Sequence, residues 1–374
     1  MVAEAVTGLS LVVWVYLAFG HGRFWRPPTL PEVAGPAGDG SLGSWPSVVA
    51  IVPARDEADV LPGTLPTLVG QDYPGSFHVV LVDDDSGDGT GDLAARLGAA
   101  VVRSAGPPPG WSGKVAAMAT GVEHAGEPDF LLFTDADIRW APGALTALVR
   151  AALAHRLDLV SQMVRLRAAS AWERATIPAF VYFFAQLYPF ARVNRAGRTA
   201  AAAGGCMLVR RATLVRAGGL GRIRGARIDD VALARVIKEH GRIWLGVTRA
   251  ATSVRPYRQL SQVWDMVARS AYVQLRYSPT LLALTSAGLL LVYAVPPVAA
   301  FSGWVLHREV LGLLGLLAWT VMTATYLPLL RFHGVSRGWS PLLPAVALLY
   351  LAMTLDSARR HAAGRGGAWK GRVA

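Results

Sequence analysis

The sequence contains few residues of several kinds, and each shortage narrows the class of protein. Cys206 is the only cysteine among 374 residues, so the chain can form no internal disulfide and is compatible with a reducing compartment. Charged residues are also scarce at 17%, while hydrophobic residues reach 53%. This balance is unusual for a soluble enzyme and indicates a protein that associates with a membrane.

Motifs of three common kinds of site are missing as well. No Gly-x-Gly-x-x-Gly turn follows the first strand-like run, no Gly-Lys-Ser/Thr phosphate loop occurs, and the histidines lack zinc-ligand spacing. The net charge is +12, but the polar part of the chain has no basic run with interleaved aromatic residues. We therefore expect no nucleic acid partner and attribute the basic excess to contact with anionic lipid.

Uncharged apolar stretches that could cross a membrane occur at both ends of the chain, at residues 5–20, 279–306, 310–330 and 338–355. The first is short against the roughly 20 residues of a spanning helix, so a cleaved signal peptide is the alternative. Glu4 stands where a signal peptide would be basic, and Arg23 and Arg26 follow an aromatic end. This pattern favours a retained anchor with its basic flank inside.

A fifth apolar stretch, at 175–191, is also uncharged. If it crossed the membrane, Asp84 and Asp137 would lie on one side of the bilayer and Asp230 on the other. We therefore predict a helix that packs in the catalytic domain or lies at the membrane interface, and an ordinary buried aromatic helix remains the alternative.

Between these stretches the chain alternates strand-like and helix-like runs. Residues 27–46 are rich in Pro and Gly and are predicted to be a linker. Helical spacing follows at 60–69 and 93–97, and β-type runs occur at 47–52, 79–82, 99–102 and 130–133. The alternation predicts an α/β sheet with parallel strands.

Three acidic clusters follow or adjoin strand-like or apolar runs, at 82–86, 134–137 and 228–230. In the second, Asp135 and Asp137 flank one residue. Oxygen ligands of this kind suit Mg²⁺ or Mn²⁺, whose remaining ligands would be diphosphate oxygens. A chance pair in a turn is the alternative, but its place after a buried strand favours the metal site.

The other clusters supply further candidate residues, each with a structural alternative. Asp84 could accept a hydrogen bond from a nucleotide base or be part of a helix cap. Lys114, one of three lysines, could contact phosphate or be a surface residue. Asp229 and Asp230 precede a helical pattern, so one of them could cap the helix while the other acts as a base on an acceptor hydroxyl.

With these residues, the chain over 47–277 resembles the family 2 glycosyltransferases of the GT-A fold. Val52-Pro-Ala-Arg-Asp-Glu57 is similar to their first-strand motif, with Asp56 where Asn is usual, and Asp229-Asp230 stands where they have Glu-Asp. The resemblance implies a nucleotide-sugar site, a metal at Asp137 and Asp135, and Asp230 as the base. The residues implied to bind the nucleotide sugar are Pro53, Arg55, Glu57, Asp84, Lys114, Asp135, Gln274 and Arg276.

The last two residues belong to Gln274-Leu-Arg276-Tyr277, a variant of the family's Gln-x-x-Arg-Trp motif, in which Gln is one residue closer and Tyr replaces Trp. Longer segments resemble the hopene-associated glycosyltransferases more specifically. These segments are 172–181, 204–211, 228–234 and 271–279. That resemblance implies a role in hopanoid biosynthesis.

The expected function is therefore an inverting transfer of a sugar from a nucleotide diphosphate sugar, with a UDP-sugar as the expected donor, to a membrane lipid hydroxyl. Alternative acceptors are a polyprenyl phosphate or a sphingolipid-like molecule. A processive polysaccharide synthase would need more spans and an intact Gln-x-x-Arg-Trp. The alternative of another class is a non-catalytic membrane scaffold that retains a nucleotide-binding fold, which the three intact acidic clusters disfavour.

We expect a multi-pass protein of the cell membrane with its catalytic domain in the cytoplasm, where nucleotide sugars are. The expected order is an N-terminal membrane anchor (1–26), a linker (27–46), a GT-A nucleotide-sugar-binding domain (47–255), an interfacial amphipathic segment (256–277), C-terminal transmembrane helices (278–356) and a basic tail (357–374). In the amphipathic segment, aromatic residues such as Trp264 are expected to face the acyl boundary of the bilayer.

The charge of the basic tail limits the topology. Three full C-terminal spans would place the tail outside the cell, against the positive-inside rule. We therefore predict that one C-terminal segment does not cross fully. The first candidate is 279–306, which contains Pro296-Pro297, and the second is 338–355.

Overall fold

The computed structural model describes residues 1–31 and 44–364, and contacts divide these residues into two compact units. The sheet unit comprises 28–31, 44–166 and 192–256. The helical unit comprises 1–27, 167–191 and 257–364. Most of the predicted linker and the last part of the basic tail lie outside the described residues. The domain limits expected from the sequence stay predictions.

The described part of the sheet unit contains one mixed eight-stranded sheet in the order β3-β2-β1-β4-β7-β6-β8-β5. Strands β3, β2, β1 and β4 are parallel, and β8 is parallel to β6. The strands are β1 (Val48–Ala54), β2 (Phe77–Asp83), β3 (Ala100–Arg103), β4 (Phe130–Phe133), β5 (Ile138–Trp140), β6 (Leu159–Arg165), β7 (Met207–Arg210) and β8 (Ile243–Ser253).

The predicted α/β fold is confirmed, and the four strands predicted from the sequence are parallel, but two of the eight strands run in the opposite direction. Strand β7 is antiparallel to β4 and β6, and β5 is antiparallel to β8. An apolar run has the same side-chain alternation in either direction, so the pattern alone does not record which way a strand runs.

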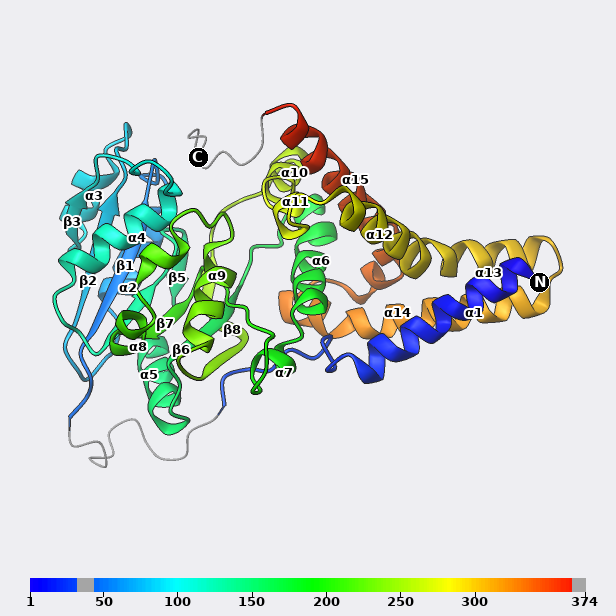
Figure 1. Ribbon diagram of the computed structural model, residues 1–374, viewed down its shortest axis with the longest axis horizontal. Helices are drawn as coiled ribbons and strands as arrows, with labels where there is room; N and C mark the ends of the chain where they lie inside the picture. Colours follow the sequence, from blue (N-terminus) through cyan, green and yellow to red (C-terminus); the bar gives the residue numbers. More distant parts are fainter. Residues whose placement is uncertain (32–43, 365–374) are drawn as a thin grey trace. The chain divides into compact units, whose positions relative to one another are not determined.

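The centre of this sheet is buried on both faces, which explains its continuous apolar runs. Every residue of β1 and β4 is buried. Figure 1 shows helices on both sides of the strands. They are α2 (Leu61–Val69), α3 (Thr90–Arg96), α4 (Gly113–His124), α5 (Ala144–Ala154), α8 (Arg211–Arg216), a 3₁₀ turn (Leu220–Ile223) and α9 (Asp229–Lys238), with α7 (Phe190–Val193) at the boundary of the units. Helix α4 lies so close to β1 that a Cβ on Gly121 would be 2.4 Å from Ile51 Cγ2.

Four helices of the described chain are long and apolar enough to cross a membrane, at Val2–Gly20, Pro279–Val305, Glu309–His333 and Arg337–Ala362. All belong to the helical unit. Its elements are α1 (Val2–Val15) with a π turn (Tyr16–Gly20), α6 (Ala171–Leu187), α10 (Leu260–Ala268), α11 (Ala271–Gln274), α12 (Pro279–Leu289), a π turn (Leu290–Ala294), α13 (Val295–Val305), α14 (Glu309–His333), a 3₁₀ turn (Arg337–Leu342) and α15 (Leu343–Ala362).

Helices α13 and α14 form a tight hairpin (Figure 1). A Cβ on Gly303 would lie 2.2 Å from the Gly312 nitrogen, and one on Gly315 would lie 2.4 Å from the Ala300 nitrogen. Small residues allow such close approach between membrane helices. Helix α1 packs on the same hairpin, since Arg308 in the hairpin turn pairs with Glu4 at 2.5 Å.

Helix α6 packs within the helical unit and is not one of the four candidate spans. The Tyr182 hydroxyl lies 2.7 Å from the Thr325 hydroxyl of α14, and the Tyr350 hydroxyl of α15 donates to the Thr176 carbonyl at 2.9 Å. The sequence predicted a helix in the catalytic domain or at the membrane interface. Its contacts group it with the apolar helices and not with the sheet, and its place at the membrane interface stays a prediction.

The segment 256–277 docks on the last turns of α15 through polar and aromatic contacts. The Trp264 indole N–H donates to Asp356 at 2.8 Å, and Arg360 pairs with Asp265 at 2.7 Å. The Tyr277 ring stacks on His361 with centroids 4.3 Å apart. Trp264 thus has a polar partner in α15, which the sequence pattern could not indicate.

Candidate active site

The candidate site begins where β1 and β2 end side by side. The Arg55 side chain donates to the Asp84 carbonyl at 2.7 Å, and its guanidinium lies 3.7 Å from the Asp84 carboxylate, which is almost fully buried. Asp56 has a positive φ of 49°, which Asn and Asp tolerate better than most residues. Its carboxylate accepts the Gly87 N–H at 2.9 Å and so joins the two loops. Pro53 is buried in β1 opposite Val82.

The second carboxylate of the Asp-x-Asp pair is held by the neighbouring strand. Asp137 is buried and accepts the Ser253 hydroxyl at 2.8 Å and the Arg255 Nε–H at 3.1 Å. Burial, and next the Asp135 carboxylate, raise the pKa of Asp137, while Arg255 opposes them. Asp137 therefore depends on a cation beside it to remain ionised.

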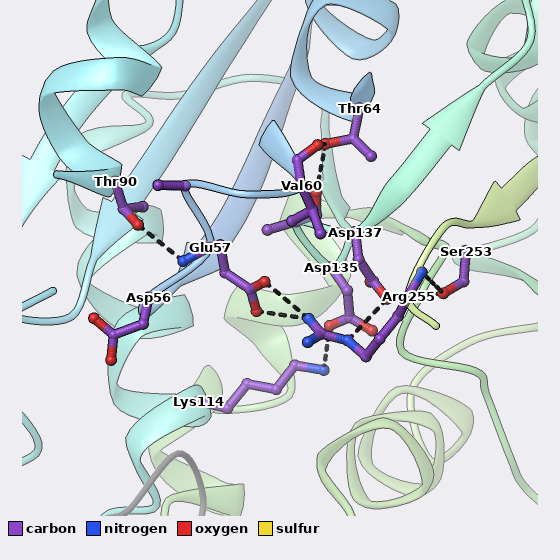
Figure 2. A network of polar contacts seen from close by, with 12 residues as sticks. Asp56, Glu57, Val60, Thr64, Thr90, Lys114, Asp135, Asp137, Ser253 and Arg255 are labelled. Carbon is purple, nitrogen blue, oxygen red and sulfur yellow. Dashed lines mark hydrogen bonds and ion pairs between the residues drawn. The ribbon is translucent and has the colours of Figure 1, made fainter. Parts of the chain in front are cut away.

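Arg255 is a residue that the sequence analysis missed. It follows β8 and donates through one nitrogen to both Glu57 oxygens, at 2.7 and 2.9 Å (Figure 2). The guanidinium thus bridges the loop after β1 and the Asp-x-Asp pair. The carboxylates were identified because they follow apolar strands, and Arg255 follows an apolar strand in the same way. The sequence analysis did not predict the strand at 243–253, so it did not find the arginine after it.

Lys114, at the start of α4, joins the metal motif to the third acidic cluster. Its ammonium lies 2.7 Å from Asp135 and 3.4 Å from Asp229 (Figure 2 draws the first of these pairs). Burial alone would lower the pKa of Lys114, but Asp135, Asp229 and Asp230 raise it above its usual value. Lys114 therefore stays charged and is no ordinary surface lysine.

Asp230 lies at the N-terminus of α9 and is held by two backbone donors. Its oxygens accept the Gly204 N–H at 3.0 Å and the Val231 N–H at 2.7 Å. Burial, and then the Asp229 carboxylate, raise the pKa of Asp230 to about 7, while Lys114 opposes them. Such a carboxylate can accept a proton near neutral pH.

The donor set fits a hard divalent cation in type, although the described residues contain no group of three or more His, Cys, Asp and Glu side chains placed to hold one. Mg²⁺ is commonly held by one or two carboxylates together with substrate phosphates and water. Asp135, whose side chain is 38% exposed, and Asp137 could supply the two carboxylates. Each of the two carboxylates also pairs with a side-chain cation, Asp135 with Lys114 and Asp137 with Arg255.

Gln274 and Arg276 lie in the helical unit. Gln274 donates to the Tyr188 hydroxyl, and Arg276 has a positive φ of 52°. Their predicted contacts with diphosphate stay predictions. The contacts described above join Arg55 to Asp84, Glu57 to Asp137 through Arg255, and Asp135 to Asp229 through Lys114. Asp230 is the neighbour of Asp229 in the chain.

Comparisons with known proteins bear on the family and the fold. The sequence model of the family described as "Glycosyltransferase like family 2" matches residues 46–272. Similar solved structures include the mannosyltransferase PcManGT from Pyrobaculum calidifontis in complex with GDP-Man and Mn²⁺. It is 20% identical, with 97% of this chain and 98% of that chain covered and a TM-score of 0.53. This likeness supports the fold.

Glucosyl-3-phosphoglycerate synthase from Mycobacterium tuberculosis, in complex with Mg²⁺ and UDP, is 16% identical, with 67% of this chain and 86% of that chain covered and a TM-score of 0.45. A search of curated proteins finds no match.

Proposed function

Because the chain belongs to glycosyltransferase family 2, we propose that it moves a sugar from a nucleotide diphosphate sugar to a lipid hydroxyl at a membrane surface, with inversion at the anomeric carbon. The observation that carries this proposal is the position of Asp230. Lys114 pairs with Asp135 on one side and with Asp229 on the other, and the charge of Asp230 also acts on it. The proposed base, Asp230, and the proposed metal ligand, Asp135, therefore lie near the same ammonium group.

The chain's residues have separable roles in this proposal. Asp230 takes the proton of the acceptor hydroxyl, and the Gly204 N–H orients its carboxylate. Asp229 and Lys114 set the charge around that base. Asp84, fixed by Arg55, contacts the nucleotide base or ribose. Asp135 and Asp137 would hold Mg²⁺ or Mn²⁺, which when bound stabilises the charge of the departing diphosphate.

The donor is proposed to be a UDP-sugar because the loop at 82–86 resembles the family's base-binding loop and offers a carboxylate to a uracil imide. The similar mannosyltransferase from Pyrobaculum calidifontis was solved with GDP-Man. Binding of UDP and GDP to the purified protein, each with Mn²⁺, separates the two donors. Tighter binding of GDP would reassign the donor.

The acceptor is proposed to be a membrane lipid because four helices of the described chain could span a bilayer. The segments that resemble hopene-associated glycosyltransferases favour a hopanoid hydroxyl, and a polyprenyl phosphate or sphingolipid-like molecule is the alternative. We place the protein in the cell membrane with its sheet unit in the cytoplasm.

The test is lipid profiling of a deletion strain beside strains complemented with the wild-type chain or with Asp230→Asn. A glycosylated hopanoid should disappear on deletion, return with the wild-type chain and stay absent with the variant, because the variant lacks the base. A missing polyprenyl-phosphate sugar would identify the alternative acceptor. An unchanged profile together with no nucleotide binding would favour the scaffold.

The packing of the helical unit also predicts the topology. Helix α15 ends against α10 and α11, which directly precede α12. Helices α12–α13 run away from α10 and α11, and α14 runs back as the second arm of a hairpin. The hairpin turn contacts the N-terminal end of α1. We therefore expect 279–306 to cross the membrane and α15 not to cross it. Of the two segments that the sequence offered as incomplete spans, 338–355 is then the one that does not cross, and the basic tail stays inside.

Alkaline phosphatase fusions measure this directly. A fusion after Arg308, in the hairpin turn, should be active because it lies outside, whereas a fusion at the C-terminus should be inactive and a fluorescent protein there should fold. Phosphatase activity at the C-terminus would show that α15 crosses.

A further inference from the structure

Arg255 binds two buried carboxylates at once, those of Glu57 and Asp137. Glu57 and Asp137 are 8% and 6% exposed, and they come from the loops after β1 and β4. The arginine side chain is 33% exposed and holds both through adjacent nitrogens, with distances of 2.7 Å to Glu57 and 3.1 Å to Asp137. Figure 2 shows the guanidinium lying between them.

This arrangement has a consequence for a divalent cation. A guanidinium within hydrogen-bond distance of Asp137 lowers the affinity of that carboxylate for another cation, since the two positive charges repel. Glu57 offers the guanidinium a second charged partner, whose two oxygens both accept from one guanidinium nitrogen. Hydrogen bonds between ionised groups are stronger than those between neutral groups.

We propose that Arg255 is a positioning residue that balances the charge of Asp137 in the metal-free enzyme, and that Glu57 keeps the guanidinium when a divalent cation takes its place at Asp137. Glu57 and Arg255 together then set the metal affinity of the site. In this proposal Glu57 acts on the metal site through the arginine. The inference rests on the proposed metal role of Asp135 and Asp137.

The test measures Mn²⁺ binding to the purified full-length protein in detergent. Electron paramagnetic resonance monitors the binding, with and without UDP. Arg255→Gln should bind Mn²⁺ roughly tenfold more tightly, because a charge at this range shifts cation affinity of a carboxylate by about that factor or more. Glu57→Gln should bind it roughly tenfold more weakly, because the arginine then loses the negative charge of Glu57 and is held less firmly away from the cation. Arg255→Lys keeps the charge and should remain close to the wild type.

A purely structural role predicts a different result, in which both variants lose thermal stability and their Mn²⁺ affinities do not move in opposite directions. Melting temperatures of all variants are therefore measured in parallel. Unchanged or weaker Mn²⁺ binding by a folded Arg255→Gln protein would overturn the proposal, as would a wild-type protein that binds no Mn²⁺. Opposite shifts in the two variants beside an unchanged lipid profile would support this inference and count against the proposed lipid transfer.

Discussion

Sugar transfer is expected to fall by at least about 100-fold when Asp137 is replaced by asparagine. Asparagine keeps the shape of the side chain and an oxygen that can accept the Ser253 hydroxyl. It removes the charge that a divalent cation needs. The measurement is initial rate together with Mn²⁺-dependent UDP binding, and both should be lost.

The structure determines which variant to use. Asp137 is buried and paired with Arg255, so Asp137→Ala would also remove part of a buried ion-pair network, which can cost about 3–5 kcal/mol of stability. Asp92→Asn is the matched control, because Asp92 is exposed and pairs with Arg103 on the surface. Near-normal turnover in folded Asp137→Asn would refute the metal assignment.

The sequence could point to these candidate residues because they follow strand ends. In an open α/β sheet the carboxyl ends of parallel strands meet at one edge, so the loops after β1, β2 and β4 had to converge. Asp84 and Asp135 lie in two of these loops, after β2 and β4. The pairing of Asp230 with Gly204 could not be derived this way, since it joins segments 26 residues apart through a backbone donor.

Other features depend on contacts that local patterns do not encode. The apolar run of α6 reads the same whether it packs on a sheet or on α14, and only the Tyr182–Thr325 contact decides. Trp264 has the spacing of an interfacial helix, yet its indole N–H is bonded to Asp356, 92 residues away. Arg255 was missed because it follows a strand that sequence periodicity did not single out.

Transfer to a lipid hydroxyl should fall by about 100-fold to 10,000-fold in Asp230→Asn, because the amide cannot accept the proton of the attacking hydroxyl. The wild-type rate should also depend on pH. A general base works only when ionised, and the pKa of Asp230 is raised to about 7. The wild-type rate should therefore be constant above about pH 7 and fall about tenfold per pH unit below it. Nucleotide binding by Asp230→Asn should stay normal.

Asp229→Asn is the matched control for this base, and it separates the roles of the two neighbouring carboxylates. Burial and the Asp229 carboxylate raise the pKa of Asp230, so removing the Asp229 charge should move the midpoint of the pH–rate profile to lower pH and leave a base in place. Asp230→Asn should lose the pH-dependent limb altogether. If Asp230→Asn keeps its turnover, the acceptor needs no deprotonation, as expected for a polyprenyl phosphate whose oxygen is already an anion. If Asp229→Asn instead loses the pH-dependent part of the profile and Asp230→Asn retains it, Asp229 is the base. Asp230, which accepts the Gly204 N–H, would then only shift the pKa of that base.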